Sequence, residues 1–267
     1  MAPKVQGSRA AGLKRLHFTG SASAARRETN DMDHSPLTGE VDVAITEGLG
    51  TFWLRPRVEA FEQAYPQITV RIDCAMSLAD VGRMTSGVAV QLVDVSSADL
   101  RKIRLGRMHA MPYAAPSYVA AFGIPQALSD VSGHRLVLQV ADQTATRELF
   151  ALVMADIPMN DVVTIQTNNS TTHYRTIAEG TGIGFLPTYV SAVCEPLVPI
   201  GMNLHFPFDI WLVCSAEAAR LPRVQRLIEW LIDAFDPRTY PWFRDYFIHP
   251  SELLKEYRGP PLAKYSF

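Results

Sequence analysis

Glu40-Val-Asp-Val-Ala-Ile45 alternates polar and apolar residues, so it predicts a strand whose three β-branched apolar side chains share one face. Over residues 54–65 the apolar side chains recur at spacings of four, three and four, which is the periodicity of an amphipathic helix. Pro66 ends that helix, because proline has no backbone N–H to continue its hydrogen bonds. A strand followed directly by a helix is the repeating unit of α/β folds.

The same alternation of strands and helices continues along the chain. Val88-Ala-Val-Gln-Leu-Val93 is almost entirely apolar, as expected for a strand buried on both faces of a parallel sheet. Ser77-Leu-Ala-Asp80 is similar to a capping box and predicts a helix that begins at Ser77. We therefore expect an α/β fold of two units, each with a parallel sheet. The other expected strands lie at residues 68–72, 135–140, 162–167, 182–187 and 210–214, and the other expected helices at 145–155, from 169 or 170, and at 224–235.

Composition and charge are those of a folded protein. Of the 267 residues, 48% are hydrophobic and 19% are charged, which is enough apolar material for one large domain or two small ones. The 25 basic and 27 acidic residues give a net charge of −2, which argues against a globally basic nucleic-acid binder. No apolar run has the length of a membrane span and no secretory signal is recognised, so we expect a cytoplasmic protein with no membrane partner.

No motif in the sequence predicts catalysis or a metal site. A nucleophile elbow and a phosphate-binding loop are absent, and the seven histidines do not have metal-ligand spacing. Gly180-Thr-Gly-Ile-Gly184 lacks the spacing of a dinucleotide fingerprint and predicts a turn between a helix and a strand. His173 is expected to lie partly exposed on a helix, with a place in a pocket as the alternative. We expect no enzyme, no cofactor and no metal.

Polar residues gather where expected strands end and helices begin, in Glu47-Gly-Leu-Gly-Thr51, at Ser77 and in Asn168-Asn-Ser-Thr-Thr172. Ligands of open parallel sheets bind outside the carboxyl ends of the strands, where helix N-termini suit anions and carbonyl groups. Each turn taken singly is also explained by helix capping. A cleft between two units would gather all three turns, which favours a binding site.

Six stretches share their order and spacing with one known family. They are residues 39–56, Phe61-Glu-Gln-Ala-Tyr-Pro66, Tyr113-Ala-Ala-Pro-Ser-Tyr118, Gly123-Ile-Pro125, Ala178-Glu-Gly-Thr-Gly-Ile-Gly-Phe-Leu-Pro187 and Pro222-Arg-Val-Gln-Arg-Leu-Ile-Glu-Trp-Leu231. On these stretches, residues 39–235 resemble the effector-binding domain, also called the substrate-binding domain, of LysR-type transcriptional regulators.

The resemblance implies an α/β fold with two Rossmann-like subdomains around a cleft, as in type 2 periplasmic binding proteins. Subdomain I is expected at residues 39–116 plus 207–250, and subdomain II at 117–206. Two crossovers between them would form the hinge. Residues 251–267 would be a C-terminal tail.

The same resemblance interprets residues 1–38 as a remnant of a wing and a linker helix, partly disordered or helical. Residues 12–20 are similar to the end of the wing, and residues 21–34 to a shortened linker helix. The recognition helix of the family's helix-turn-helix has no counterpart in residues 1–11. We therefore expect that this chain lacks a complete helix-turn-helix. DNA binding would take place only through such a domain.

The resemblance also implies a ligand site in the cleft. Hydroxyl, amide and backbone N–H groups at facing helix N-termini would hold a small polar molecule, with a carboxylate as one candidate, between two aromatic walls. The alternative for the two aromatic residues, Phe52 and Phe185, is that they pack in the hydrophobic core and do not contact a ligand. The implied residues are Thr51, Ser77, Asn169, Ser170, Phe52 and Phe185.

The function that the resemblance implies is that of a small-molecule-sensing regulatory domain which controls transcription through ligand-dependent closure. We expect a homodimer or higher oligomer whose interface responds to that closure. The alternative is a stand-alone cytoplasmic solute-binding protein, or a dominant-negative partner that does not bind DNA.

Overall fold

The first strand of the computed structural model is β1 (Gly39–Ile45), which lies where the alternating stretch predicts it. The structure describes residues 37–84, 87–95, 97 and 99–265. Residues 1–36 of the expected wing and linker remnant lie outside this described part. On either side of β1 lie β2 (Ile68–Cys74) and β3 (Gly87–Gln91), both parallel to it. All five residues of β3 are buried, as its apolar sequence predicts.

The main sheet is mixed rather than parallel. Its strand order is β2-β1-β3-β9-β4-β7, with β8 (Val198–Pro199) also paired to β4. The strand β9 (Phe206–Ser215) is antiparallel to β3 and to β4 (Leu100–Ala114), and β7 (Gly184–Pro187) is antiparallel to β4. The expectation of purely parallel sheets was therefore wrong, and the long strand β4 was not predicted.

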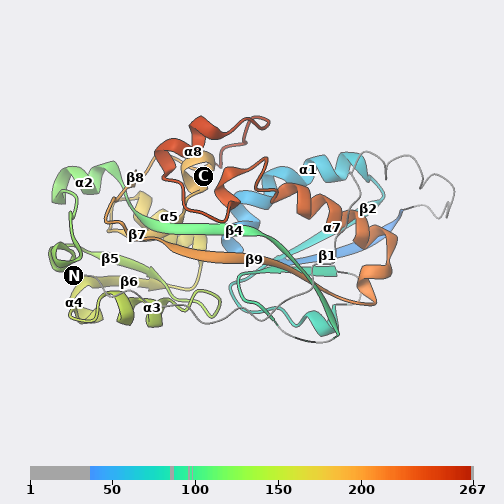
Figure 1. Ribbon diagram of the computed structural model, residues 1–267, viewed down its shortest axis with the longest axis horizontal. Helices are drawn as coiled ribbons and strands as arrows, with labels where there is room; N and C mark the ends of the chain where they lie inside the picture. The colour runs from blue at the N-terminus through green and yellow to red at the C-terminus, as the bar shows by residue number, and fades with distance from the viewer. Residues whose placement is uncertain (1–36, 85–86, 96, 98, 266–267) are drawn as a thin grey trace. The chain divides into compact units, whose positions relative to one another are not determined.

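A second, smaller sheet pairs β5 (Leu136–Gln139) with β6 (Val163–Thr167) in parallel. In Figure 1, β5 and β6 lie at one end of the long pair β4 and β9, together with α3, while β1 and β2 lie at the other end beside α1 and α7. The strands β4 and β9 therefore connect the two groups of elements.

Most helices agree with the sequence periodicity. The expected helix over residues 54–65 is α1 (Arg55–Ala64), preceded by a π-helical turn η1 (Leu49–Leu54). The apolar stripe over residues 224–235 forms α7 (Pro222–Ala234), whose buried side chains lie three to four residues apart. The other helices are α2 (Pro116–Phe122), η3 (Leu128–Gly133), α3 (Thr146–Val153), α4 (Met159–Val162), α5 (Ser170–Ala178), α6 (Val190–Val193), η4 (Ala218–Arg220), η5 (Pro241–Phe243) and α8 (Pro250–Glu256).

The helix predicted to begin at Ser77 is not present. Ser77 lies in irregular backbone after β2, and only one short turn, η2 (Val81–Arg83), follows it. Only Val81 of that turn is buried, and Leu78 is 45% exposed. A short helix in water needs an apolar face packed against the core, and the described part of this segment has none.

The buried side chains form two large clusters. The first contains the aromatic residues Trp53, Trp242 and Phe243, and the indole N–H of Trp53 donates to the carbonyl oxygen of Ala234 at 2.8 Å. The second cluster is built entirely from residues 114–202. Residues 137–194 also contribute side chains to the first cluster. The expected subdomain boundaries at 116/117 and 206/207 stay a prediction.

The end of the chain folds as short turns and a short helix. Both η5 and α8 begin with proline, and Trp242 and Phe243 of η5 are buried in the first cluster. Cys194 and Cys214 are buried, whereas Cys74, at the end of the edge strand β2, is exposed. Among the described residues, no helix is long and apolar enough to cross a membrane.

The crossing of β4 over η5 gives a test of this packing. A Cβ atom on Gly106, at the irregularity of the β4–β9 ladder, would lie 2.8 Å from the carbonyl oxygen of Phe243. We expect Gly106→Ala to lower the free energy of unfolding by about 1–3 kcal/mol, because backbone must move to admit the methyl group. Gly133→Ala is the control, since a Cβ there meets nothing within 4 Å. Urea unfolding of both variants measures the difference, and equal stabilities would contradict the packing.

Candidate effector-binding site

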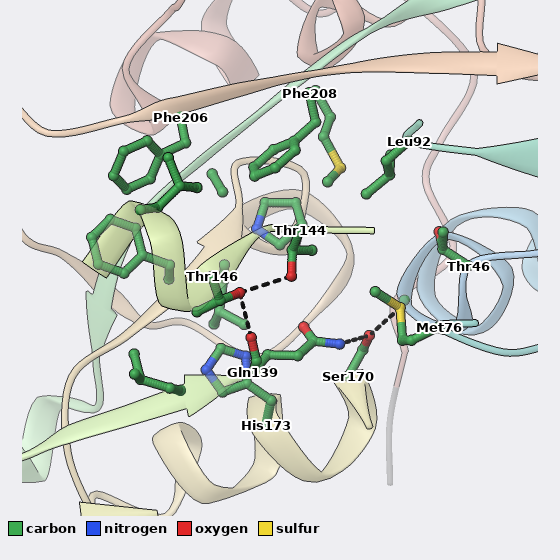
Figure 2. Close-up of a pocket in the computed structure, with 18 of the residues that line it drawn as sticks. Thr46, Met76, Leu92, Gln139, Thr144, Thr146, Ser170, His173, Phe206 and Phe208 are labelled. Atoms are coloured by element: carbon green, nitrogen blue, oxygen red, sulfur yellow. Dashed lines mark hydrogen bonds between the residues drawn. The ribbon is translucent and has the colours of Figure 1, made fainter. Parts of the chain in front are cut away.

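An apolar cavity of about 120 Å³ lies against both sheets. Its walls come from η1, from β5 with the helices α3 and α5, and from the long strands β4 and β9. Figure 2 shows Phe206 and Phe208 of β9 on one side and His173 and Ser170 of α5 on the opposite side. Below, "the apolar cavity" means this space. Because its lining draws on residues 46–52, 136–154, 170–190 and 206–208, a bound molecule would touch segments far apart in the sequence.

The polar groups of the apolar cavity form a short hydrogen-bonded chain. The amide nitrogen of Gln139 donates to Oγ of Ser170 at 2.7 Å, and Oγ1 of Thr146 donates to the carbonyl oxygen of Gln139 at 2.6 Å. The hydroxyls of Thr144 and Thr146 lie 2.7 Å apart (Figure 2). Among the residues that the structure describes, no lining side chain is Asp, Glu, Lys or Arg. The cavity is therefore apolar with a few neutral hydrogen-bonding groups.

His173 is the one titratable histidine of this lining, and it is 1% exposed. Its Nε2 lies 3.0 Å from the carbonyl oxygen of Val137, and since a carbonyl only accepts, Nε2 carries the proton. The unprotonated Nδ1 is buried and has no hydrogen-bond partner among the described residues. Burial lowers the pKa of His173 to about 4, so the ring is neutral at pH 7.

The expectation that His173 is partly exposed was wrong, and Gly184 gives the reason. A Cβ on Gly184 would lie 2.8 Å from Nε2 of His173, so only glycine lets α5 approach β7 this closely. The close approach covers the histidine ring. The alternative, in which His173 lines a pocket, is the arrangement found.

The N-terminus of α5 is occupied by the carboxylate of Glu47, which follows β1 and is 8% exposed. Oε2 of Glu47 accepts from the backbone N–H of Thr171 at 3.0 Å, and Oε1 accepts from the Thr171 hydroxyl. Oε1 also accepts from the hydroxyl of Thr51 at 3.3 Å. A carboxylate is favoured at a helix N-terminus by the free N–H groups and the helix dipole. The chain thus supplies its own anion at this position.

Of the residues implied by the resemblance, Phe52, Ser170 and Phe185 line the apolar cavity. Ser77 and Asn169 instead line a neighbouring space of about 340 Å³, which we call the polar recess. The other residues of the polar recess are Glu47, Cys74, Ala75, Met76, Val140, Ala141, Asp142 and Asn168.

Thr51 lines neither space, and the expectation that it begins a helix was wrong. The helical backbone already begins at Glu47, so Thr51 lies one turn into this helical segment and bonds to Glu47. The same expectation is wrong for Ser77, which begins no helix. Asn169 and Ser170 do lie at a helix N-terminus: Oδ1 of Asn169 caps α5 by accepting from the N–H of Thr172 at 2.7 Å. The predicted convergence of all four residues on one space is therefore not found.

Sequence reasoning did not select Glu47, Gln139 or Thr146 as site residues. Glu47 is the first residue of the turn Glu47-Gly-Leu-Gly-Thr51. The feature that could have indicated a site residue is a carboxylate shortly after a buried strand. Gln139 is the polar residue at the carboxyl end of an expected strand, where ligands of α/β sheets bind. Thr146 begins α3, and no sequence pattern distinguished it.

Comparison with known proteins identifies the class. Residues 34–236 match the family described as LysR substrate binding domain, and the chain belongs to this family. The chain resembles the iron-regulated virulence regulatory protein IrgB of Vibrio cholerae, with 23% identity over 185 residues that cover 69% of this chain and 60% of IrgB. It also resembles the HTH-type transcriptional regulator DmlR of Escherichia coli, with 22% identity over 81% of this chain and 71% of DmlR.

Solved structures agree on the fold. The regulatory domain of CrgA, a LysR-type transcriptional regulator from Neisseria meningitidis, superposes with a TM-score of 0.60 at 16% identity, covering 74% of this chain and 99% of that domain. The regulatory domain of AphB from Vibrio vulnificus gives 0.55 at 20% identity, covering 73% and 99%. The predicted fold class, an α/β fold like that of the type 2 periplasmic binding proteins, is confirmed.

The buried neutral histidine makes stability depend on pH. Its pKa is about 4 in the folded protein against 6.5 for a free side chain, so the unfolded chain binds more protons between these values. Stability contributed by neutral His173 is therefore present above pH 6.5 and is lost as the pH falls toward 4, by about 3 kcal/mol in all. His173→Gln keeps an amide donor near the Nε2 position and removes the titration. Urea unfolding across this range should show a smaller loss for the variant, and identical pH profiles would contradict the assignment.

The Glu47 carboxylate should stabilise the contact between η1 and α5. Glu47→Ala removes the acceptor for the N–H and hydroxyl of Thr171, and we expect the free energy of unfolding to fall by about 2 kcal/mol. Glu62→Ala, on the exposed face of α1, should change it by less than about 0.5 kcal/mol. Thermal and urea unfolding of the two variants provide the measurement. A Glu47→Ala protein as stable as Glu62→Ala would show that the bond contributes nothing.

Proposed function

We propose that this chain is the small-molecule-sensing regulatory domain of a LysR-type transcriptional regulator, and that its effector binds in the apolar cavity. The observation that carries the proposal is the lining of that cavity by η1, β5, α5, β4 and β9, which belong to widely separated parts of the chain. A molecule held there makes contacts that depend on how these elements sit against one another. Its binding can therefore favour one arrangement of the domain over another.

We propose subdomains at residues 39–116 plus 207–250 and at 117–206, with β4 and β9 as the connection between them. Two strands that cross from one core to another can act as a hinge, because a small change of twist along a ladder moves the elements at its ends. The effector would shift the population toward the closed arrangement by its higher affinity for that state. The regulatory output would be a change at the interface of a homodimer.

The chain spans 60% of the length of IrgB and 71% of DmlR, so the activity of a whole regulator is part of the proposal. We propose control of transcription through a DNA-binding helix-turn-helix in the regulator, with this domain as a non-catalytic sensor in the cytoplasm. IrgB and DmlR are both named as regulators, which supports this reading of the domain.

The test is ligand-dependent stabilisation that needs the apolar cavity. A small-molecule library of neutral aromatics, carboxylates and amino acids is screened by thermal unfolding of the full chain. A compound at a hundred times its dissociation constant adds about 2.7 kcal/mol, which raises Tm by about 5 °C or more. Ala110→Phe places a ring into the cavity from β4 and should abolish the response.

Ala120→Phe, on the exposed surface of α2, is the matched control and should respond like the wild type. Small-angle scattering of the stabilised wild type should show a more compact particle. A library with no stabilising compound, or a response retained in Ala110→Phe, would contradict the proposal.

A further inference from the structure

We propose that the effector is a neutral, largely apolar molecule, about one six-membered ring in size, which donates a hydrogen bond to Nδ1 of His173. This inference rests on the proposed function and names the chemical class of ligand for the same cavity. It replaces the carboxylate that the sequence had suggested as a candidate.

The absence of charge around the apolar cavity is the first support. Leu49, Phe150, Phe185, Phe206 and Phe208 are among its walls, and no lining side chain among the described residues carries a positive charge at pH 7. A carboxylate that enters an apolar space loses its hydration and gains affinity only if a cation or several N–H donors replace the water. The described lining offers no cation, so the cavity favours a neutral ligand.

The position of Glu47 is the second support. Helix N-termini bind anions through their free N–H groups, but the N-terminus of α5 already holds the Glu47 carboxylate on Thr171 and the Asn169 amide oxygen on Thr172. A ligand carboxylate there would meet the Glu47 carboxylate. The polar recess beside it contains Glu47 and Asp142 and, within the described part of the chain, no basic residue, so it does not suit an anion either.

The unpaired nitrogen of His173 is the third support, and it defines the polar end of the ligand. Nδ1 is a buried acceptor without a partner among the described residues, and a buried acceptor left unpaired costs free energy. A ligand hydroxyl or N–H would supply the missing donor. Ser170 lies one helical turn earlier on the same face of α5, and its hydroxyl points at Sδ of Met76 at 3.6 Å, a weak contact that a ligand oxygen can replace.

The size of the cavity sets the third property of the ligand. Its volume is about 120 Å³, and apolar cavities of roughly 150 Å³ in other proteins stay dry and bind benzene. One six-membered ring therefore fills most of the space. Figure 2 shows where the polar end would lie, with His173, Gln139 and Ser170 together at one side of the cavity and Phe206 and Phe208 at the other.

Three matched probes test the ligand class on the full chain: phenol, benzene and benzoate, titrated at neutral pH by calorimetry and NMR. Phenol carries the donor, benzene lacks it, and benzoate carries the negative charge. We expect phenol to bind about threefold to tenfold more tightly than benzene, and benzoate about a hundredfold more weakly than phenol. Phenol should also move the ¹⁵N resonance of the unprotonated Nδ1 of His173 upfield, as acceptance of a hydrogen bond does.

Three variants separate the contributions. Ala110→Phe should abolish phenol binding, while Ala120→Phe keeps it, which locates the site. Glu47→Gln removes the carboxylate beside α5 and should bring the affinity for benzoate closer to that for phenol. Because the wild-type series alone distinguishes the three probes, the test does not depend on the stability of any variant.

The possible results overturn different statements. Benzoate binding more tightly than phenol would overturn the ligand class and leave the sensor function intact. Equal affinity for phenol and benzene, with an unmoved Nδ1 resonance, would overturn the role of His173. If none of the probes binds while a library compound still stabilises the chain through the cavity, the ligand class fails alone; if no compound stabilises it, the proposed function fails as well.

Discussion

The antiparallel ladder between β4 and β9 is the contact on which the rest of the structure depends. It runs from the pair Leu100–Ser215 to the pair Ala110–Phe206 and joins strands about a hundred residues apart in the sequence. One end of the ladder carries β3 and, through it, β1 and β2, while β4 continues beyond the other end to pair with β7 and β8. This pairing therefore joins the two groups of elements, and the bond from Glu47 to Thr171 adds a second contact between them.

The ladder also builds the apolar cavity. Met108 and Ala110 of β4, with Phe206 and Phe208 of β9, contribute to the lining from neighbouring positions of the two strands. On the ladder's partly exposed side, Arg107 and Arg104 both bind the carboxylate of Asp209, which lies opposite Arg107 in the register. Cross-strand pairs of opposite charge stabilise such a ladder modestly, whereas the burial of its aromatic face contributes far more.

The charge pattern around α5 explains why this site differs from the one expected. The sequence placed several polar residues at helix N-termini, which suggested an anion held by N–H groups. In the structure the anion is the side chain of Glu47, and the hydroxyl of Thr51 bonds to that carboxylate and not to a ligand. The space available to a ligand is the apolar cavity, whose lining includes the polar residues Gln139, Ser170 and His173.

Local sequence patterns were enough to predict β1, β2, β3 and α7, because alternation and the helical repeat depend only on neighbouring residues. They also placed the cap Asn169, since an N-cap bonds within its own turn. The resemblance of residues 39–235 to a known family supplied the fold class. The long strand β4 was missed because Arg101, Lys102 and Arg104 make its first half polar, and its pairing with β9 depends on a partner remote in the chain.

The sequence by itself therefore determined the α/β alternation, the family and the apolar character of the segments that meet at the cavity. Only the tertiary structure decided which side chains meet there. Glu47 reaches α5 across 124 positions of sequence, and the burial of His173 follows from the close approach of α5 to Gly184. Hydrogen-bond partners and desolvation are properties of contacts between distant segments, so no local pattern contains them.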